Sequence, residues 1–150
     1  MNNIALFPGS FDPFTIGHHD IVLRSLKLFD EVVIGIGKNS AKTRQFSLEF
    51  LIPKIEESFK NFNQVRVIAY EGLTADFAKT ISAKFLIRGL RNTTDFEYEN
   101  SIAEVNKFLW PELETIFLKT SPEYSSISST IIRDIYKYGK DVSSFLPYNL

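Results

Sequence analysis

The chain has 150 residues, of which 44% are hydrophobic and 23% charged, and its formal net charge is −1. This length suits one domain with a sizeable core, and the near-zero charge offers no general attraction for nucleic acid or a membrane surface. The chain has no cysteine, which excludes disulfides, thiolate metal sites and a cysteine nucleophile. It shows no signal-peptide pattern and no apolar run of membrane-spanning length, so we expect one cytoplasmic domain over residues 1–150.

Short apolar segments alternate with segments of helical periodicity along the chain. The predicted strands cover residues 4–7, 32–36, 65–69, 85–87 and 115–118. The predicted helices cover residues 20–29, 47–59, 73–82, 94–109 and 129–138, with a short turn and a loose end over residues 140–150. The strands lack strict alternation of apolar and polar residues, which is typical of strands buried on both faces. The pattern predicts an α/β fold with a doubly wound, five-stranded parallel sheet, in which ligands bind at the carboxyl ends of the strands.

The segment after the first strand, PGSFDPFTIGHHD at residues 8–20, contains two glycines and two adjacent histidines. Gly17 and His18 fall where the next helix is expected to begin, and free backbone N–H groups there attract anions. His18 could therefore donate to phosphate oxygens as charge develops on them. A plain strand–helix turn with a capping histidine explains the spacing equally well. His19 has no such glycine partner, and we expect it to point elsewhere.

Basic and hydroxyl side chains follow the other predicted strands. Arg88 and Arg91 flank Gly89 after the fourth strand, and arginine forks suit phosphate groups, although an ion pair with a nearby acid is the ordinary alternative. Residues 125–130 supply five hydroxyls before the last helix, more than one N-cap requires. For Lys42 and Glu99, a solvent-exposed position on the surface is the ordinary explanation. Together these loops predict a site for a polyanion at one edge of the sheet.

Two sequence motifs resemble those of known enzymes. Residues 15–18, TIGH, resemble the [H/T]-x-G-H signature of nucleotidylyltransferases, and residues 127–133, ISSTIIR, resemble their I-S-S-T-x-x-R signature. Residues 7–18, 86–99 and 145–147 also resemble blocks of the bacterial phosphopantetheine adenylyltransferases, the second of them without a gap. The resemblance extends over nearly the whole chain.

This resemblance implies a Rossmann-like nucleotidylyltransferase fold and transfer of AMP from ATP to 4′-phosphopantetheine, which gives dephospho-CoA and pyrophosphate by direct in-line displacement. It also implies Mg²⁺ bound through the ATP phosphates and a homo-oligomer, a hexamer in this family, with no nucleic-acid or membrane partner.

The resemblance also assigns roles to particular residues. His18 would stabilise the transition state. The residues implied to bind the acceptor are Ser10, Lys42, Thr74 and Arg88. The residues implied to hold ATP are Ser10, Phe11, His18, Gly89, Leu90, Arg91, Glu99, Tyr124, Ser125, Ser126, Ile127, Ser128, Ser129 and Thr130. Two positions depart from the family pattern: Ser10 stands where many relatives have threonine, and Thr74 replaces a typically apolar residue.

Two other functions remain open from the sequence. One is a nucleotidylyltransferase that acts on nicotinamide mononucleotide, or that joins CTP to a polyol phosphate. The other is a non-catalytic domain that binds a nucleotide without turning it over. The first would share the TIGH and ISST motifs without requiring the block at residues 86–99, and the second would not require His18.

Overall fold

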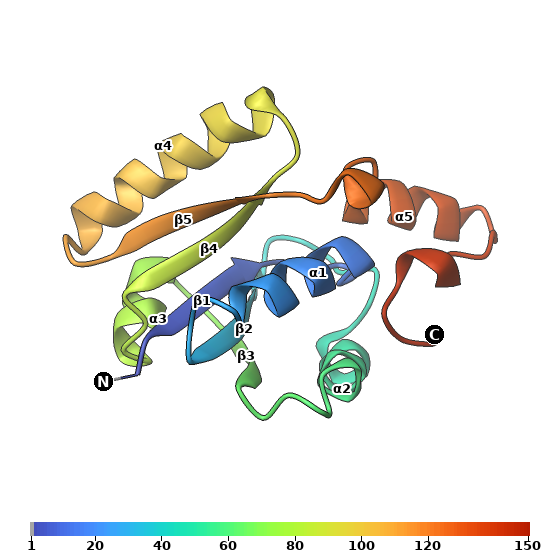
Figure 1. Cartoon of the computed structure of the whole chain (residues 1–150). Helices are drawn as coiled ribbons and strands as arrows, with labels where there is room; N and C mark the ends of the chain where they lie inside the picture. The colour runs from blue at the N-terminus through green and yellow to red at the C-terminus, as the bar shows by residue number, and fades with distance from the viewer. Residues whose placement is uncertain (1) are drawn as a thin grey trace.

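The computed structural model describes residues 2–150 and contains one parallel sheet covered by helices on both faces (Figure 1). The strands are β1 (Ile4–Gly9), β2 (Glu31–Gly37), β3 (Val65–Tyr70), β4 (Phe85–Leu90) and β5 (Glu114–Lys119). The helices are α1 (Ile16–Ser25), α2 (Leu48–Ser58), α3 (Thr74–Thr80), α4 (Thr93–Leu109) and α5 (Ser129–Lys137), with short 3₁₀ turns at Pro122–Tyr124 and Ser143–Phe145. The strand order β3-β2-β1-β4-β5, parallel throughout, confirms the predicted doubly wound sheet. None of the helices within residues 2–150 is long and apolar enough to cross a membrane.

Successive residues of the central strands are buried against opposite layers of helices. Ala5 and Phe7 of β1 join a core cluster that includes residues of α1, α2 and α5. Leu6, between them, joins a second cluster with Ala75 and Ala78 of α3. A strand that is buried on both faces carries no polar alternation, which explains the continuous apolar runs in the sequence.

The two central strands separate before they end. β1 pairs with β2 over six residues, from Ile4 to Gly9, but with β4 only at Ala5 and Leu6. The strand order also reverses between β1 and β4, because the chain builds one side of the sheet through β3 and then crosses to the other side. In sheets of this kind the reversal opens a crevice at the carboxyl ends, where ligands bind.

The structure corrects several predicted boundaries. β4 continues to Leu90, so Arg88 and Gly89 lie within the strand and not in the loop after it. α1 begins at Ile16, earlier than residue 20, because Thr15 caps it. The predicted loose end is also wrong, since Leu146 and Tyr148 are buried in the core cluster that includes α1 and α2.

Candidate active site

A cavity of about 430 Å³ opens at the carboxyl ends of β1 and β4, where the two strands separate. Its walls come from β1, the start of α1, β4, and the segment that leads into α5. The sequence-predicted residues that line it are Ser10, Phe11, His18, Arg88, Gly89, Arg91, Glu99, Tyr124, Ile127, Ser128, Ser129 and Thr130. Residues from four distant parts of the sequence therefore meet at the edge of the sheet where the sequence predicts a polyanion site.

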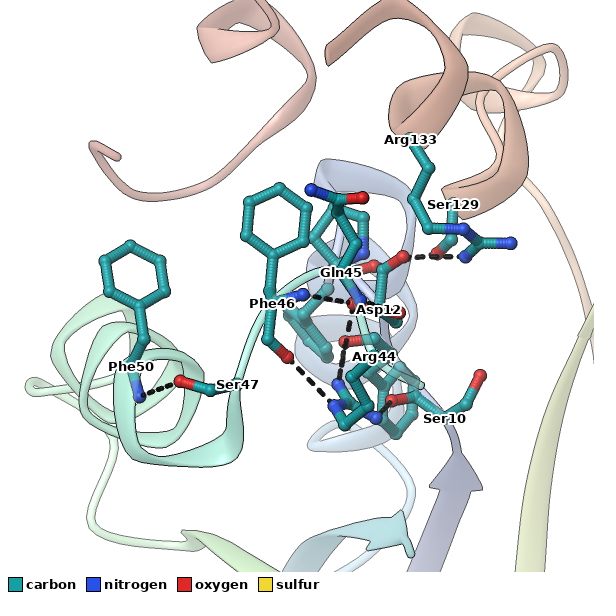
Figure 2. Close-up of polar contacts among 12 residues, drawn as sticks. Ser10, Asp12, Arg44, Gln45, Phe46, Ser47, Phe50, Ser129 and Arg133 are labelled. Carbon is teal, nitrogen blue, oxygen red and sulfur yellow. Dashed lines mark hydrogen bonds and ion pairs between the residues drawn. The ribbon is translucent and has the colours of Figure 1, made fainter. Parts of the chain in front are cut away.

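Arg44 supports the backbone of Ser10 and Phe11, two residues that line this cavity (Figure 2). Its guanidinium donates to the backbone carbonyls of Ser10 (2.6 Å) and Phe11 (3.1 Å), and also to the carbonyl of Phe46 (2.9 Å). Phe11 has a φ of 45°, a left-handed conformation that non-glycine residues rarely adopt. The Phe11 ring lies over Gly9, where a Cβ atom would come within 2.8 Å of it. Arg44 thus stabilises a strained backbone at the point where the chain turns away from β1.

Asp12 connects the same turn to the loop after β2 by hydrogen bonds. Its carboxylate accepts from the backbone N–H groups of Gln45 (2.9 Å) and Phe46 (2.8 Å), also drawn in Figure 2. The side chain is buried, and a buried carboxylate requires such partners. The two loops therefore form one unit.

Two side chains of α5 hold the turn from the other side. Arg133 donates to the carbonyl of Asp12 (2.7 Å), and the Ser129 hydroxyl donates to the carbonyl of Pro13 (2.7 Å). Both side chains point from α5 toward the turn in Figure 2. The ISSTIIR motif at residues 127–133 therefore has a structural role in this chain besides the binding role that the resemblance implies.

His18 is held in one tautomer by the residue that caps its helix. The backbone N–H of Thr15 donates to His18 Nδ1 at 3.0 Å, and the Thr15 hydroxyl accepts from the backbone N–H of His18 at 3.2 Å. Because Nδ1 accepts a hydrogen bond, the ring proton resides on Nε2, which can donate to a ligand in the cavity. This capping box places the histidine at the positive end of α1.

The surroundings of His18 keep its ring neutral. Burial, followed by the positive charges of Arg88 and Arg91, lowers the pKa of His18 to about 3. The ring packs against Phe11 and Phe14, with centroids 4.9 Å and 5.4 Å away. At neutral pH this residue is therefore a fixed hydrogen-bond donor, and it is neither a cation nor a general acid.

Arg88 and Glu99 form a bidentate ion pair across the cavity. Arg88 Nε and Nη2 each lie 2.6 Å from a Glu99 carboxylate oxygen, and Nη1 donates to the carbonyl of Pro8. The last contact bridges the gap between β1 and β4. A guanidinium carries five N–H donors, so two of them remain for a ligand. Glu99 is 8% exposed, which shows that its expected place on a solvated helix face is wrong.

A second cavity of about 170 Å³ lies on the other side of this ion pair. Both cavities are lined by Pro8, Gly9, Arg88 and Glu99. Thr74 lines only the second one, where its hydroxyl lies 2.8 Å from that of Tyr70. The threonine therefore has a polar partner in the position where the family pattern has an apolar residue.

Arg91 lies near the mouth of the larger cavity and pairs with Asp95. Its Nε atom lies 3.0 Å from a carboxylate oxygen of Asp95, and its backbone N–H donates to the same oxygen at 3.0 Å. Partial burial raises the pKa of Asp95, but the hydrogen bonds from Arg91 outweigh this effect and hold it below its ordinary value. The carboxylate stays charged and orients the arginine.

Some of the sequence-predicted residues do not line either cavity. Ser125 and Ser126 are exposed, and the Ser125 hydroxyl donates to the carbonyl of Pro122. Leu90 ends β4 outside both cavity walls. Lys42 is exposed in the loop after β2, two residues before Arg44, and its role stays a prediction.

The two histidines have different surroundings, as the sequence suggests. His19 faces away from the cavity, where its Nε2 lies 3.3 Å from the carbonyl of Ser58 and its ring stacks on Phe59. It joins α1 to the end of α2. Its neighbour His18 is the one that reaches the site.

Sequence reasoning missed several residues that build the site. Thr15, Asp95 and Thr120 line the cavity, and Arg44 and Arg133 support it. The capping role of Thr15 has a local signal, since a threonine three residues before a histidine can form a capping box. Arg133 is the arginine of the ISSTIIR motif, but the motif does not show that Arg133, like Arg44, donates to a backbone carbonyl far away in the sequence.

Comparisons with known proteins identify the family of this chain. Residues 6–135 match the family model described as cytidylyltransferase-like, so the chain belongs to this class of nucleotidyltransferases. Within the class, the chain is 61% identical to the phosphopantetheine adenylyltransferase of Cytophaga hutchinsonii over the full length of both proteins. It is 50% identical to that of Lachnoclostridium phytofermentans, over 98% of this chain and 90% of the relative. The chain belongs to the phosphopantetheine adenylyltransferase family.

A solved structure supports the fold. A bifunctional NMN adenylyltransferase/ADP ribose pyrophosphatase from Francisella tularensis aligns with all of this chain and with 46% of its own length, at a TM-score of 0.75 and 18% identity. At this identity the likeness concerns the fold alone. It agrees with the nucleotidylyltransferase architecture that the sequence predicts.

The neutral state of His18 leads to a prediction about pH. Its pKa is lowered from 6.5 to about 3, so between these values the unfolded chain binds a proton that the folded chain does not. The contribution of His18 to stability is therefore complete above about pH 6.5 and declines as the pH falls toward 3. We expect NMR titration to find the His18 ring neutral at pH 5, with its proton on Nε2. A midpoint near the ordinary histidine value would contradict this assignment.

Proposed function

We propose that this protein transfers the AMP group of ATP to 4′-phosphopantetheine and releases dephospho-CoA and pyrophosphate. The proposal rests chiefly on one observation: His18 is a neutral donor, held by Thr15 at the start of α1, in a cavity lined by Arg88 and Arg91. Family membership supplies the substrates, because curated relatives at up to 61% identity are phosphopantetheine adenylyltransferases. The site supplies donors for a triphosphate and has room for a nucleotide.

The larger cavity suits ATP. Gly89 lines this cavity, and a Cβ atom at its position would contact Ile21, another lining residue, at 3.4 Å. The Ser128 hydroxyl caps α5 by accepting from the backbone N–H of Ile131, and residues 128–130 line the cavity, so the positive end of that helix lies at the cavity. We place the adenosine and triphosphate here, with the phosphates between α1 and the arginines.

The smaller cavity suits the acceptor. It adjoins the first cavity at the Arg88–Glu99 pair, so a molecule bound there could direct its phosphate toward ATP past the guanidinium. Leu86, Ile102 and Ala103 give it apolar walls, and Asn106 and Thr74 add polar groups. This mixture fits a pantetheine arm, which alternates amide groups and short carbon chains.

We infer direct in-line displacement. The phosphate oxygen of the acceptor forms a bond to the α-phosphorus of ATP, and the bond from that phosphorus to the bridging oxygen of pyrophosphate breaks. The acceptor phosphate is already ionised, so the reaction requires no general base, and positioning and charge stabilisation supply the catalysis. His18 Nε2–H would donate to the phosphate oxygens as charge develops on them. The remaining Arg88 donors would orient the acceptor phosphate.

We propose Mg²⁺ as the cofactor, carried by the triphosphate. Within residues 2–150, no group of three or more histidine, cysteine, aspartate or glutamate side chains is arranged to hold a metal ion. Mg²⁺ in nucleotide sites commonly binds phosphates and water with few protein ligands, so the residues of this cavity are compatible with it. When bound, the ion would neutralise charge on the phosphates. We also propose that the enzyme works in the cytoplasm.

We propose further that the protein is a homo-oligomer, a hexamer by family resemblance. One face of α4 carries Tyr98, Ile102, Val105 and Leu109 at alternating intervals of four and three residues, and Tyr98 and Val105 are 67% and 57% exposed. Phe108 beside them is 85% exposed. A contiguous apolar surface of this kind favours contact with another protein surface, and we assign it to a second copy of the chain.

A panel of acceptors tests the reaction. We expect pyrophosphate release from ATP with 4′-phosphopantetheine and none with nicotinamide mononucleotide or a polyol phosphate. Turnover with one of the latter instead would assign the chain to a different transferase. Binding of ATP without turnover of any acceptor would indicate a non-catalytic nucleotide-binding domain.

His18→Ala tests the catalytic assignment. We expect kcat to fall roughly 100- to 1,000-fold, because the loss of one preorganised donor raises the activation free energy by about 3–4 kcal/mol. The matched control is His19→Ala, which alters the adjacent position outside the cavity. An equal loss of kcat in both variants would show that His18 holds no special role.

Analytical ultracentrifugation tests the assembly. We expect the mass of six chains for the wild type and a smaller species for Val105→Asp, because a charge on the α4 face would be buried without a partner. The control is Leu28→Asp, which places the same charge at an exposed leucine elsewhere. A monomeric wild type would refute the proposal.

A further inference from the structure

Tyr148 contacts the backbone just before α1, although it lies far from that helix in the sequence. After α5 the chain makes the 3₁₀ turn at Ser143–Phe145 and returns toward α1 (Figure 1). Tyr148 is 8% exposed and packs in the core cluster with Phe14, Val142 and Leu146. Its hydroxyl donates to the backbone carbonyl of Phe14 at 2.7 Å.

That carbonyl belongs to the same peptide group as the N–H that orients His18. The Phe14 carbonyl and the Thr15 N–H lie on one planar unit, whose oxygen accepts from Tyr148 and whose hydrogen is donated to His18 Nδ1 at 3.0 Å. A single rigid peptide thus connects the tyrosine hydroxyl with the imidazole ring. The two hydrogen bonds, one at the carbonyl oxygen and one at the N–H, set the orientation of this peptide plane.

We propose that Tyr148 is a positioning residue for His18, acting through the Phe14–Thr15 peptide group to hold the ring in its Nε2–H tautomer. This inference rests on the proposed role of His18 in the reaction. Tyr148 lies outside both cavities and touches neither substrate site. Its effect on the chemistry is therefore indirect.

The peptide plane decides the tautomer because its N–H group can only donate. The Thr15 hydroxyl also lies 3.2 Å from Nδ1, but a hydroxyl donates or accepts and is compatible with either tautomer. If the peptide rotated, Nδ1 could carry the proton and Nε2 would lose it. A hydrogen bond to the carbonyl also polarises the amide and strengthens the bond that its N–H makes.

Tyr148 remains a donor over the working range of pH. Burial raises the pKa of its hydroxyl, and the nearby negative charge of Asp12 raises it further. The group therefore stays protonated at neutral pH. A phenylalanine would fill the same space in the core and lose only the hydrogen bond.

The test compares Tyr148→Phe with Tyr138→Phe, a matched loss of a hydroxyl at a tyrosine that is 84% exposed at the end of α5. The chain has only two histidines, so ¹⁵N-histidine labelling and a His19→Gln background allow the His18 ring nitrogens to be assigned. In the ligand-free protein we expect the Nδ1 resonance of Tyr148→Phe to move upfield and the Nε2 resonance to move downfield, because the Nδ1–H tautomer becomes populated. We expect no change in Tyr138→Phe.

Kinetics supply the second readout. We expect Tyr148→Phe to lower kcat by about 3- to 10-fold, the effect of one ordinary hydrogen bond, and to change either KM by less than about 2-fold. A loss of packing alone would lower the thermal midpoint and leave the Nδ1 resonance of the folded protein in place. Wild-type Nδ1 shifts in Tyr148→Phe would therefore overturn the inference, whatever the stability of the variant.

The two proposals can fail separately. If His18→Ala keeps full activity, the proposed role of His18 is wrong, and the NMR result still reports whether Tyr148 orients the ring. If His18→Ala is inactive and Tyr148→Phe has wild-type kcat and wild-type ring shifts, the catalytic assignment stands and the role of Tyr148 is refuted.

Discussion

The backbone carbonyls between β1 and α1 form the constraint on which the rest of the site depends. This segment belongs neither to the sheet nor to a helix, and buried carbonyls without partners would cost stability. Side chains from other parts of the chain supply the donors: Arg44, Arg133, Ser129 and Tyr148. The segment that carries the ligand-facing backbone is therefore shaped almost entirely by distant residues. Its form in turn sets the position of His18 and the floor of the larger cavity.

The pair formed by Arg88 and Glu99 has a second function in this arrangement. It joins β4 to α4 and lines both cavities, while Arg88 also reaches the carbonyl of Pro8 on β1. A bidentate pair costs desolvation energy, but it leaves a guanidinium whose direction is fixed before any ligand arrives. A preoriented arginine loses less entropy on binding a phosphate than a mobile one would. In the function that we propose, structural support and substrate positioning are thus properties of the same side chains.

Much of the fold could be predicted from the sequence because its signals are local. Short runs without polar alternation indicated strands buried on both faces, and their separation by helical segments indicated a parallel sheet. The site could be placed at one edge of that sheet, and the TIGH and ISSTIIR motifs indicated which residues meet there. The burial of Glu99 and the support from Arg44 and Tyr148 could not be predicted. These depend on how far apart β1 and β4 lie and on contacts between residue 14 and residue 148, and neither has a periodic signature.

The separation in sequence of these contacts has a consequence for how the molecule assembles. The hydrogen bonds that Arg88, Ser129, Arg133 and Tyr148 donate to backbone carbonyls of residues 8–14 join residues 80, 116, 121 and 134 positions apart. The sheet itself is completed only when β1 meets β4 across the chain between Ala5 and Phe85. After that, the longer contacts add little further cost, because loop-closure entropy grows slowly with loop length. The turn after β1 therefore takes its shape from segments of both halves of the chain.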